Sequence, residues 1–564
     1  MNILGINYFY HDTSACVVQD GELTTAVEQE RFSRVKHTWQ FPTDAIDRAL
    51  RESGLEPGDV TDVAVSIDPG KHRLRKMSFA PTLGRRVLPF VKHEMLRARA
   101  REKEFARWWE SMFGGLARPP RLHRVGHHLS HIAGSFFVSS YERAALLSID
   151  GSGEWSTTWL GHTDGTSFDC ISESFFPNSL GSFYESATEF CGFRPNYDEG
   201  KTMGLAPFGD PERFYAQMSR LVDVDDLGRL SVDGSYFAYQ NWGNRRCGPK
   251  YIEAFGRPRG RHDEIEKHHE DVAAAAQKVL EERVLEMCRV IEGRTDADYL
   301  VIAGGVALNS VMNGRILRET RFKDLYVMPA AGDNGTSIGA AYYVYNHVLG
   351  QSKRYHHIDP YLGPSYCPEV IEALLKECKL PYERSADVCV DTARLLKDGE
   401  IVGWFQGRME IGPRALGNRS ILCDPTLQQM KDKINADVKH REAYRPFAPS
   451  ALADRASEFF DIDVEAPFML KVCPVRPENR DVLPAITHVD GSARLQTVRR
   501  ETNERYYRLI EEFGKLSGVP VVLNTSFNIM GEPIVESPVQ AIRCFFSTGI
   551  DVLVLGDFII RKKP

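Results

Sequence analysis

The sequence predicts an α/β protein with two domains, of which the first is a duplicated fold. Three observations lead to this prediction. The 564 residues are more than a single hydrophobic core fills. A pattern of strand, polar turn and hairpin occurs twice, near residues 1–30 and 144–175. Helices and short strands then alternate after about residue 365.

Each copy of the repeat contains three expected strands. They lie at residues 3–7, 15–19 and 23–27 in the first copy and at 144–149, 156–161 and 169–175 in the second. Asp20-Gly21 and Asp164-Gly165 mark the hairpin turns. Apolar spacing over residues 263–291 predicts a long helix between the repeat and the second domain.

The second domain is expected to begin where the chain becomes polar and aromatic, before Pro360 and Pro364. We place the domains at residues 1–355 and 356–564. Strands of the second domain are expected at 402–405, 421–423 and 519–523.

Composition excludes several classes of protein. Apolar residues make up 42% and charged residues 26%, which excludes a disordered chain, and a formal net charge of −7 gives no overall attraction for nucleic acid. Eleven cysteines without a C-x-x-C pair exclude a disulfide framework and a zinc ribbon. The first residues read as a strand without a signal peptide, and no apolar run reaches ~18 residues. We therefore expect a cytoplasmic protein without a membrane span; a homo-oligomer is compatible with the sequence.

Residues 71–124 carry an unusual charge. This segment contains fifteen Lys or Arg and four Glu, a local excess of +11, which leaves −18 for the rest of the chain. A solvated helical insert explains such a run. We favour this explanation, and a basic surface for an anionic substrate, a lipid headgroup or a partner is the functional alternative.

A candidate metal centre begins with His127 and His131, which share one face of a helix because they are four residues apart. Surface or capping histidines are the alternative explanation of this pair. Asp150 and Asp333 come directly after a strand and at the start of a glycine turn, where they could complete the site. Two imidazoles and two carboxylates suit iron or manganese better than a structural zinc.

Polar, glycine-rich turns are candidates for nucleotide binding, because such turns present backbone N–H groups to phosphates. They occur at residues 11–14, 150–154, 200–204 and 304–305. Glycine turns that serve chain geometry alone are the alternative.

A second group of candidates is cationic and lies in the second domain. Arginines in the Gly/Pro-rich loop 407–420 could clamp phosphate or carboxylate oxygens, or form a structural salt-bridge loop. If residues 439–441 and 526–528 are extended, Lys439 shares a face with Arg441, and Ser526 with Asn528. These side chains would then line an anion pocket or a solvated strand face.

Taken in order, these strings resemble the NodU/CmcH/TobZ family of O-carbamoyltransferases. The likeness runs from residue 1 to about 560 and does not include the basic segment. It is carried by residues 9–12, 28–37, 127–131, 150–154, 200–206, 303–313, 333–339, 407–420, 444–449 and 523–533.

The resemblance implies an N-terminal actin-like (ASKHA) domain, similar to the tRNA threonylcarbamoyl transferase TsaD, and a C-terminal YrdC-like domain. It implies that the second domain makes carbamoyl adenylate from carbamoyl phosphate and ATP with Mg. The first domain, which holds Fe(II), Mn or another divalent cation, then transfers the carbamoyl group to the hydroxyl of a small-molecule acceptor such as a natural product or sugar. Nucleic acid is not expected as a partner.

The resemblance also assigns residues to roles. The expected catalytic residues are His11, Asp12 and Lys36, the last in a basic strand, and the expected metal ligands are His127, His131, Asp150 and Asp333. The N-terminal nucleotide or adenylate site is expected to use Gly151, Ser152, Lys201, Gly304, Gly305 and Asn309. The carbamoyl phosphate and ATP site is expected to use Arg414, Arg419, Lys439, Arg441, Arg445, Asn524, Ser526 and Asn528.

Two other functions remain as alternatives. A tRNA threonylcarbamoyl transferase would use the basic segment as an RNA surface, but the C-terminal half resembles the antibiotic-type enzymes. An actin-like ATP switch that transfers no group would explain the repeated turns but not the His/Asp set.

Overall fold

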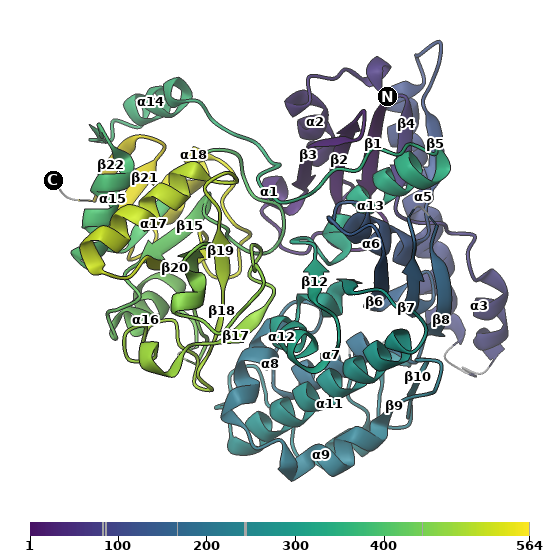
Figure 1. Ribbon diagram of the computed structural model, residues 1–564. Helices are drawn as coiled ribbons and strands as arrows, with labels where there is room; N and C mark the ends of the chain where they lie inside the picture. The colour runs from purple at the N-terminus through teal and green to yellow at the C-terminus, as the bar shows by residue number, and fades with distance from the viewer. Residues whose placement is uncertain (82–83, 85–86, 166, 242–244, 443, 563–564) are drawn as a thin grey trace. The chain divides into compact units, whose positions relative to one another are not determined.

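The computed structural model describes residues 1–81, 84, 87–165, 167–241, 245–442 and 444–562 (Figure 1). The chain divides into two compact units. The N-terminal unit comprises Met1–Thr24 and Trp39–His356, and the C-terminal unit comprises Thr25–Thr38 and His357–Pro564. The short segment Thr25–Thr38 thus groups with the C-terminal unit, although its place in the sequence put it in the first domain. In the described residues, no helix is both long and apolar enough to cross a membrane.

The N-terminal unit contains two five-stranded sheets with the same topology. Their strand orders are β3-β2-β1-β4-β5 and β8-β7-β6-β11-β12. In each sheet the first strand of the copy pairs antiparallel with the second and parallel with the fourth. This confirms the duplicated, actin-like fold that the repeat and the resemblance predict. The strands are β1 (Asn2–Asn7), β2 (Ser14–Gln19), β3 (Glu22–Glu28), β4 (Asp62–Val65), β5 (Arg121–Arg124), β6 (Ala144–Gly153), β7 (Ser156–Thr163), β8 (Asp169–Phe175), β11 (Tyr299–Ala303) and β12 (Asp324–Val327).

Two helices pack on these sheets and on each other. α13 (Thr336–Tyr342) packs against β1 and β2, and α6 (His127–Phe136) packs against β6 and β11. They cross at Gly134 and Gly339, where a Cβ atom on Gly339 would lie 1.6 Å from the carbonyl oxygen of Ser130. Only glycine permits such a close approach of two backbones. The crossing brings the start of α6 beside the turn that precedes α13.

The remaining helices of the N-terminal unit surround this centre (Figure 1). The long helix expected at 263–291 is confirmed as α11. The described elements are α2 (Thr43–Glu52), α3 (Arg73–Phe79), α4 (Val87–Val91), α5 (Arg97–Phe113), α7 (Leu180–Phe190), α8 (Glu199–Leu205), α9 (Glu212–Met218), α10 (Pro249–Phe255), α11 (Lys267–Glu292) and α12 (Ser310–Glu319), with the small strands β9 (Val222–Val224) and β10 (Leu230–Val232). Of the basic residues in the 71–124 segment, Arg85 and Arg86 lie outside the described residues.

The C-terminal unit is built on an eight-stranded mixed sheet in the order β13-β22-β21-β14-β15-β20-β16-β19. The central strands β14, β15, β20 and β21 are mostly buried on both faces because helices cover both. In β14, Trp404 packs with helices α15 and α17, whereas Phe405 packs with α14 and α18. The strands are β13 (Glu383–Arg384), β14 (Val402–Phe405), β15 (Arg419–Cys423), β16 (Ala448–Leu452), β19 (Gln496–Val498), β20 (Val521–Ser526), β21 (Val552–Leu555) and β22 (Phe558–Arg561).

The helices of this unit are α1 (Glu30–Ser33), α14 (Pro368–Glu377), α15 (Val388–Lys397), α16 (Met430–Lys433), α17 (Glu504–Ser517) and α18 (Pro538–Phe546), and a second small sheet pairs β17 (Val472–Pro474) with β18 (Ser492–Arg494). The strand expected at 519–523 begins two residues later, at Val521. Residues 439–441 are not extended, because Lys439 ends a π-helical stretch and His440 is left-handed.

Candidate functional site

The two histidines of α6 face a common point. His127 and His131 are both buried, and their Nε2 atoms lie 3.1 Å apart. The third histidine of the string, His128, points elsewhere and bonds Ser148 through Nδ1 at 2.8 Å. The helical spacing in the sequence therefore predicts correctly which two imidazoles converge.

Two carboxylates complete the cluster. One oxygen of Asp150 lies 3.1 Å from Nε2 of His127 and 3.3 Å from Nε2 of His131. An oxygen of Asp333 lies 3.5 Å and 3.4 Å from the same two nitrogens. One ligand atom from each residue can be chosen so that all four lie within 4.8 Å of one another. The four side chains expected to bind metal are thus brought together.

The donor set of this cluster fits a divalent cation. Burial alone would lower the pKa of His131, but its hydrogen bonds and charge interactions with Asp150 and Asp333 outweigh burial and raise that pKa to about 9. An imidazole held between buried carboxylates needs a positive charge, which either a proton or a metal ion supplies. Two imidazole nitrogens and two carboxylate oxygens are a set that Fe(II) and Mn(II) accept.

Backbone amides hold Asp150 in its orientation. Its second oxygen accepts hydrogen bonds from Gly151 N at 2.8 Å and Gly305 N at 3.3 Å. Gly304 has φ +90°, and a Cβ there would lie 2.2 Å from the carbonyl oxygen of Ile149. Gly151 and Gly305, which we expected to cradle a nucleotide, direct their N–H groups to a predicted metal ligand in this structure. Gly304 N instead donates to the carbonyl oxygen of Ala331 at 2.9 Å.

Glu154 and Asn7 were missed in the sequence, and both support the cluster. The buried Glu154 side chain accepts a hydrogen bond from His127 N at 3.1 Å and another from Asp68 N, which fixes the start of α6. Asn7, 2% exposed, donates through Nδ2 to the backbone oxygens of His11, Asp12 and Asp333. Asn7 thereby ties the 11–12 turn to a metal-ligand candidate. A polar residue within a buried strand was the available signal for Asn7.

His11 and Asp12 lie in the turn between β1 and β2. His11 Nδ1 is 2.8 Å from a carboxylate oxygen of Asp12, and the His11 side chain is about one-third exposed. Burial would lower the pKa of His11, but Asp12, Asp333 and Asp150 hold it above its ordinary value. The contact with Asp12 fixes the orientation of the ring.

The other N-terminal nucleotide candidates have different surroundings. Asn309 and Gln277 exchange two side-chain hydrogen bonds, at 2.9 and 3.1 Å, and Asn309 also caps α12. Lys201 forms an ion pair with Asp198 at 3.4 Å, and Ser152 is exposed at the end of β6. The hydrogen bonds of Asn309 therefore stabilise the fold.

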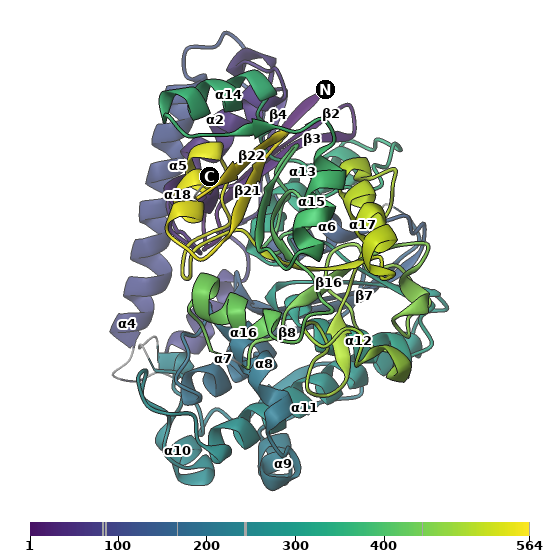
Figure 2. The same ribbon diagram turned by 90° about the vertical axis from the view of Figure 1, so that its left-hand side faces the viewer.

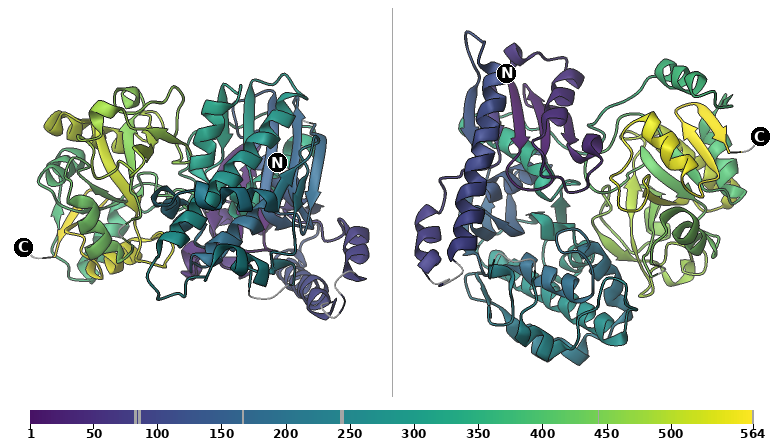
Figure 3. Two further views of the ribbon diagram at one scale, coloured as in Figure 1. Left: turned by 90° about the horizontal axis from the view of Figure 1, so that it is seen from below. Right: turned by 180° about the vertical axis from the view of Figure 1, so that it is seen from behind.

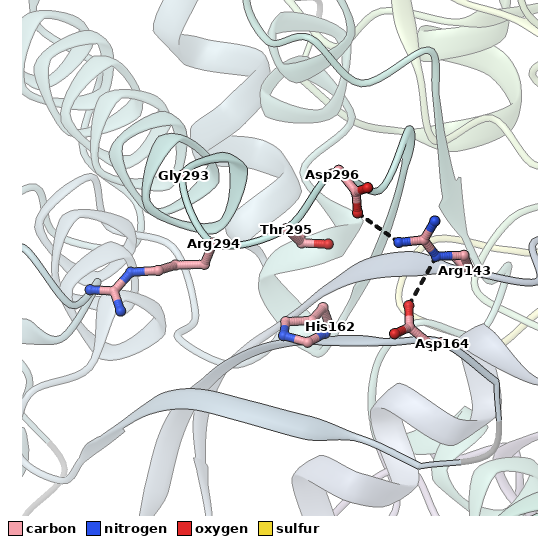
Figure 4. A pocket seen from close by; sticks show the side chains of 7 residues that line it. All are labelled: Arg143, His162, Asp164, Gly293, Arg294, Thr295 and Asp296. Atoms are coloured by element: carbon pink, nitrogen blue, oxygen red, sulfur yellow. Dashed lines mark hydrogen bonds and ion pairs between the residues drawn. The ribbon is translucent and has the colours of Figure 1, made fainter.

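A shallow cavity of about 340 Å³ elsewhere in the N-terminal unit contains none of the predicted site residues (Figure 4). Arg143 bridges Asp164 at 2.9 Å and Asp296 at 2.6 Å within it. The charge of this arginine is matched by two exposed carboxylates. Its lining residues are Arg143, His162, Asp164, Gly293, Arg294, Thr295 and Asp296.

The C-terminal unit buries an ammonium group beside the end of β20. Lys439 is 4% exposed, and its Nζ donates to the backbone oxygen of Ser526 and, at 2.8 Å, to Oδ1 of Asn528. Burial, with the charges of Arg441, Arg445 and Lys36, lowers the pKa of Lys439 to about 7. Lys439, Ser526 and Asn528 therefore meet as predicted, although residues 439–441 are not a strand.

Four guanidinium groups gather near this lysine. The pKa of Arg414 is lowered to about 10 and that of Arg441 to about 9. Burial is the larger cause of both shifts, and the charge of Arg445 is the next largest. Arg494 is the fourth member, and burial with the charges of the other three holds its pKa well below the ordinary value. Nε of Arg414 and Nε of Arg494 are buried without a hydrogen-bond partner among the described residues. Arg494 lies in no recognisable motif, so no sequence signal pointed to it.

Two of the predicted ligands in this unit instead support the fold. Arg419 is fully buried, stacks 3.7 Å over the ring of Phe405, and donates to the backbone oxygens of Gln406, Gly407, Pro364 and Glu536. Asn524 donates through Nδ2 to Ala415 O, Ser450 Oγ and Gln496 Oε1. The donor groups of both side chains are therefore directed to the protein itself, whereas Oδ1 of Asn524 is buried without a hydrogen-bond partner among the described residues.

Lys36 follows α1 in a loop and not in a strand as expected. Its segment belongs to the C-terminal unit, and its charge acts on Lys439. The same segment is anchored by Arg31, 1% exposed, which bonds Glu28 at 2.8 Å and the backbone oxygen of Gly412 at 2.5 Å. Lys36 is therefore part of the cationic group around Lys439.

Comparison with known proteins gives a consistent result for both units. Residues 2–342 match the family described as Carbamoyltransferase N-terminus, and residues 393–562 match Carbamoyltransferase C-terminus. The chain is 39% identical over 598 residues to protein sll1178 of Synechocystis, covering 100% of this chain and 97% of that protein. It is 37% identical to the nodulation protein NolNO of Sinorhizobium fredii (99% and 80% covered) and 40% identical to NolO of Bradyrhizobium diazoefficiens (78% and 79% covered). The chain therefore belongs to the carbamoyltransferase family.

Proposed function

We propose that this carbamoyltransferase is an ATP-dependent enzyme that makes carbamoyl adenylate and passes the carbamoyl group to a hydroxyl of a small-molecule acceptor. The observation that carries the proposal is the group of buried arginines in the C-terminal unit, two of which have Nε atoms without a partner among the residues that the structure describes. Buried like charges are costly unless a ligand of opposite charge compensates them. Phosphates are such ligands, and guanidinium groups bind them with paired N–H donors.

The first reaction would take place at these cations. Carbamoyl phosphate loses its phosphate to water and gives carbamate, whose oxygen attacks the α-phosphorus of ATP, held with Mg, and releases pyrophosphate. Lys439, Arg414, Arg441, Arg445 and Arg494 would hold the phosphates and the charge that develops on the leaving groups. Ser526 and Asn528 position Lys439 for this role.

The second reaction would take place in the N-terminal unit. A hydroxyl of the acceptor attacks the carbamoyl carbon of the adenylate, the C–O bond to AMP breaks, and the hydroxyl proton leaves. The neutral form of His11 would accept that proton at Nε2 while Asp12 holds Nδ1. Water must be excluded, since it competes with the acceptor for the mixed anhydride.

The His/Asp cluster would hold a divalent cation, for which we propose Fe(II) or Mn(II). His127, His131, Asp150 and Asp333 are the ligands, and Gly151, Gly305 and Glu154 orient them. When bound, the cation polarises a carbamoyl or phosphoryl oxygen. All eleven cysteines are free, which supports our further proposal that the protein works in a reducing cytoplasm.

Pyrophosphate release tests the first reaction without knowledge of the acceptor. Purified protein is given ATP and carbamoyl phosphate, together and separately, with Mg present. Release that requires both substrates supports adenylate formation, and hydroxylated metabolites can then be screened as acceptors. Absence of release from folded, metal-loaded protein in the presence of a broad acceptor mixture would contradict the proposal.

A further inference from the structure

A continuous helix presents a stripe of basic and apolar side chains to solvent. α4, the π-helical stretch Lys92–Leu96 and α5 follow one another without a break (Figure 2). Six of its exposed residues recur at spacings of three or four, which place them on one helix face. These residues are Leu88, Lys92, Leu96, Arg99, Lys103 and Arg107, and the exposed Glu110 follows three residues later.

The opposite face anchors this helix. Phe105, Trp108 and Phe113 are buried, and the ring of Phe105 stacks on Tyr8 with centroids 4.9 Å apart. The stripe is therefore the outer face of a fixed helix.

The neighbouring helix α3 extends the same surface. An ion pair of 2.9 Å between Lys76 and Glu94 joins α3 to the π-helical stretch, and Figure 3 shows α3 beside one end of the long helix. Leu74, Leu88 and Met77 are 82%, 74% and 70% exposed, the highest values of any large apolar side chain in the described part of the chain. All three lie on this surface, which we call the basic-apolar surface.

The four cations of the helix stripe are not matched by acidic side chains in the described part of the chain. Lys92, Arg99, Lys103 and Arg107 form no ion pair with a residue that the structure describes. The segment carries an excess of +11, whereas the rest of the chain carries −18. An anionic partner would thus be attracted here and repelled by the rest of the protein.

We propose that the basic-apolar surface docks on an anionic lipid bilayer. Exposed leucine and methionine side chains beside lysine and arginine are the composition of helices that lie in a membrane interface. Nucleic acid would use the cations but would leave the leucines and Met77 in water, because phosphate binding is electrostatic. The apolar side chains therefore favour the bilayer over RNA.

Vesicle sedimentation with the full-length protein tests this proposal. Vesicles of phosphatidylcholine alone are compared with vesicles of equal parts phosphatidylcholine and phosphatidylglycerol, and an RNA duplex is assayed separately. A charge variant combines Arg99→Glu, Lys103→Glu and Arg107→Glu. An apolar variant combines Leu74→Ser, Met77→Ser and Leu88→Ser.

Each variant has a matched control. The charge control, Lys323→Glu with Lys376→Glu and Arg394→Glu, changes the net charge equally at side chains that are each 64% exposed. The apolar control, Val370→Ser with Val489→Ser and Val539→Ser, replaces side chains that are 50%, 64% and 58% exposed. Unfolding midpoints confirm that all four variants fold.

We expect binding only to the anionic vesicles. The charge variant should bind about a hundredfold more weakly, since each lysine or arginine near an anionic leaflet contributes about fivefold, and the apolar variant at least about fivefold more weakly. Both controls should bind as the wild type does. The proposal is overturned if wild-type protein does not bind anionic vesicles. It is also overturned if the apolar variant and the wild type bind vesicles equally and bind RNA equally.

Discussion

Gly339 fixes the distance between α6, which carries His127 and His131, and α13, which follows the turn that carries Asp333, so Gly339→Ala should disturb both stability and the site. The new Cβ would meet Ser130 O at 1.6 Å, Ser130 C at 2.6 Å and Gly134 N at 2.8 Å, all of them backbone atoms that cannot rotate away. Overpacking of this kind costs about 3 kcal/mol. Alanine in a helix regains about 1 kcal/mol over glycine. The net expected loss is about 2 kcal/mol in the free energy of unfolding.

Urea unfolding and metal content measure the two consequences. Gly200→Ala is the control, because Gly200 also lies in a helix and a Cβ there would have no neighbour within 4 Å. The control should be unchanged or slightly more stable. Gly339→Ala should also retain less iron or manganese, because separating α6 from α13 lengthens the distances from Asp333 to the histidines, now 3.4 and 3.5 Å. A Gly339→Ala protein as stable as the control would refute this reasoning.

Two further predictions concern the C-terminal unit. Arg419→Met should lose about 3 kcal/mol of unfolding free energy, because several buried carbonyl oxygens lose their hydrogen-bond donor. Arg494→Met should stay within about 1 kcal/mol of the wild-type stability or gain stability. It should nevertheless slow pyrophosphate release. Equal destabilisation in denaturant unfolding would mean that Arg494 also serves the fold. The KM for carbamoyl phosphate should rise with pH above about 7, by up to about tenfold per pH unit. In this range Lys439 of the substrate-free enzyme loses its proton and with it the attraction for the anion. Lys439→Arg should flatten this profile, and a wild-type KM independent of pH between 6 and 9 would contradict the assignment.

Much of the fold was predictable because its signals are local. Alternating apolar residues and Asp-Gly turns give the hairpins of both repeats, and the common sheet order confirms the duplication. The convergence of His127 and His131 follows from helix geometry alone. Their meeting with Asp150 and Asp333 rests on the resemblance to a known family and on the chain crossing at Gly134 and Gly339, which no local pattern predicts.

The remaining features depend on long-range packing. Arg414 and Arg419 come from one loop, yet Arg419 turns inward to carbonyl groups while Arg414 keeps an unpartnered Nε. Arg494 joins the cationic group from a short strand that lacks a motif. Segment Thr25–Thr38 groups with the C-terminal unit, so Lys36 acts on Lys439 despite 402 intervening residues. Contacts of this range leave no trace in residue spacing.

The central claim is that adenylate formation belongs to the C-terminal cations and carbamoyl transfer to the N-terminal metal centre. First-turnover pyrophosphate release by His127→Ala and by Lys439→Ala tests it most directly, with metal content and unfolding midpoints measured on the same samples. We expect His127→Ala to lose metal but release pyrophosphate at the wild-type rate. We expect Lys439→Ala to keep its metal and to release pyrophosphate at least about a hundredfold more slowly. A folded His127→Ala protein that releases no pyrophosphate would contradict the division between the two units.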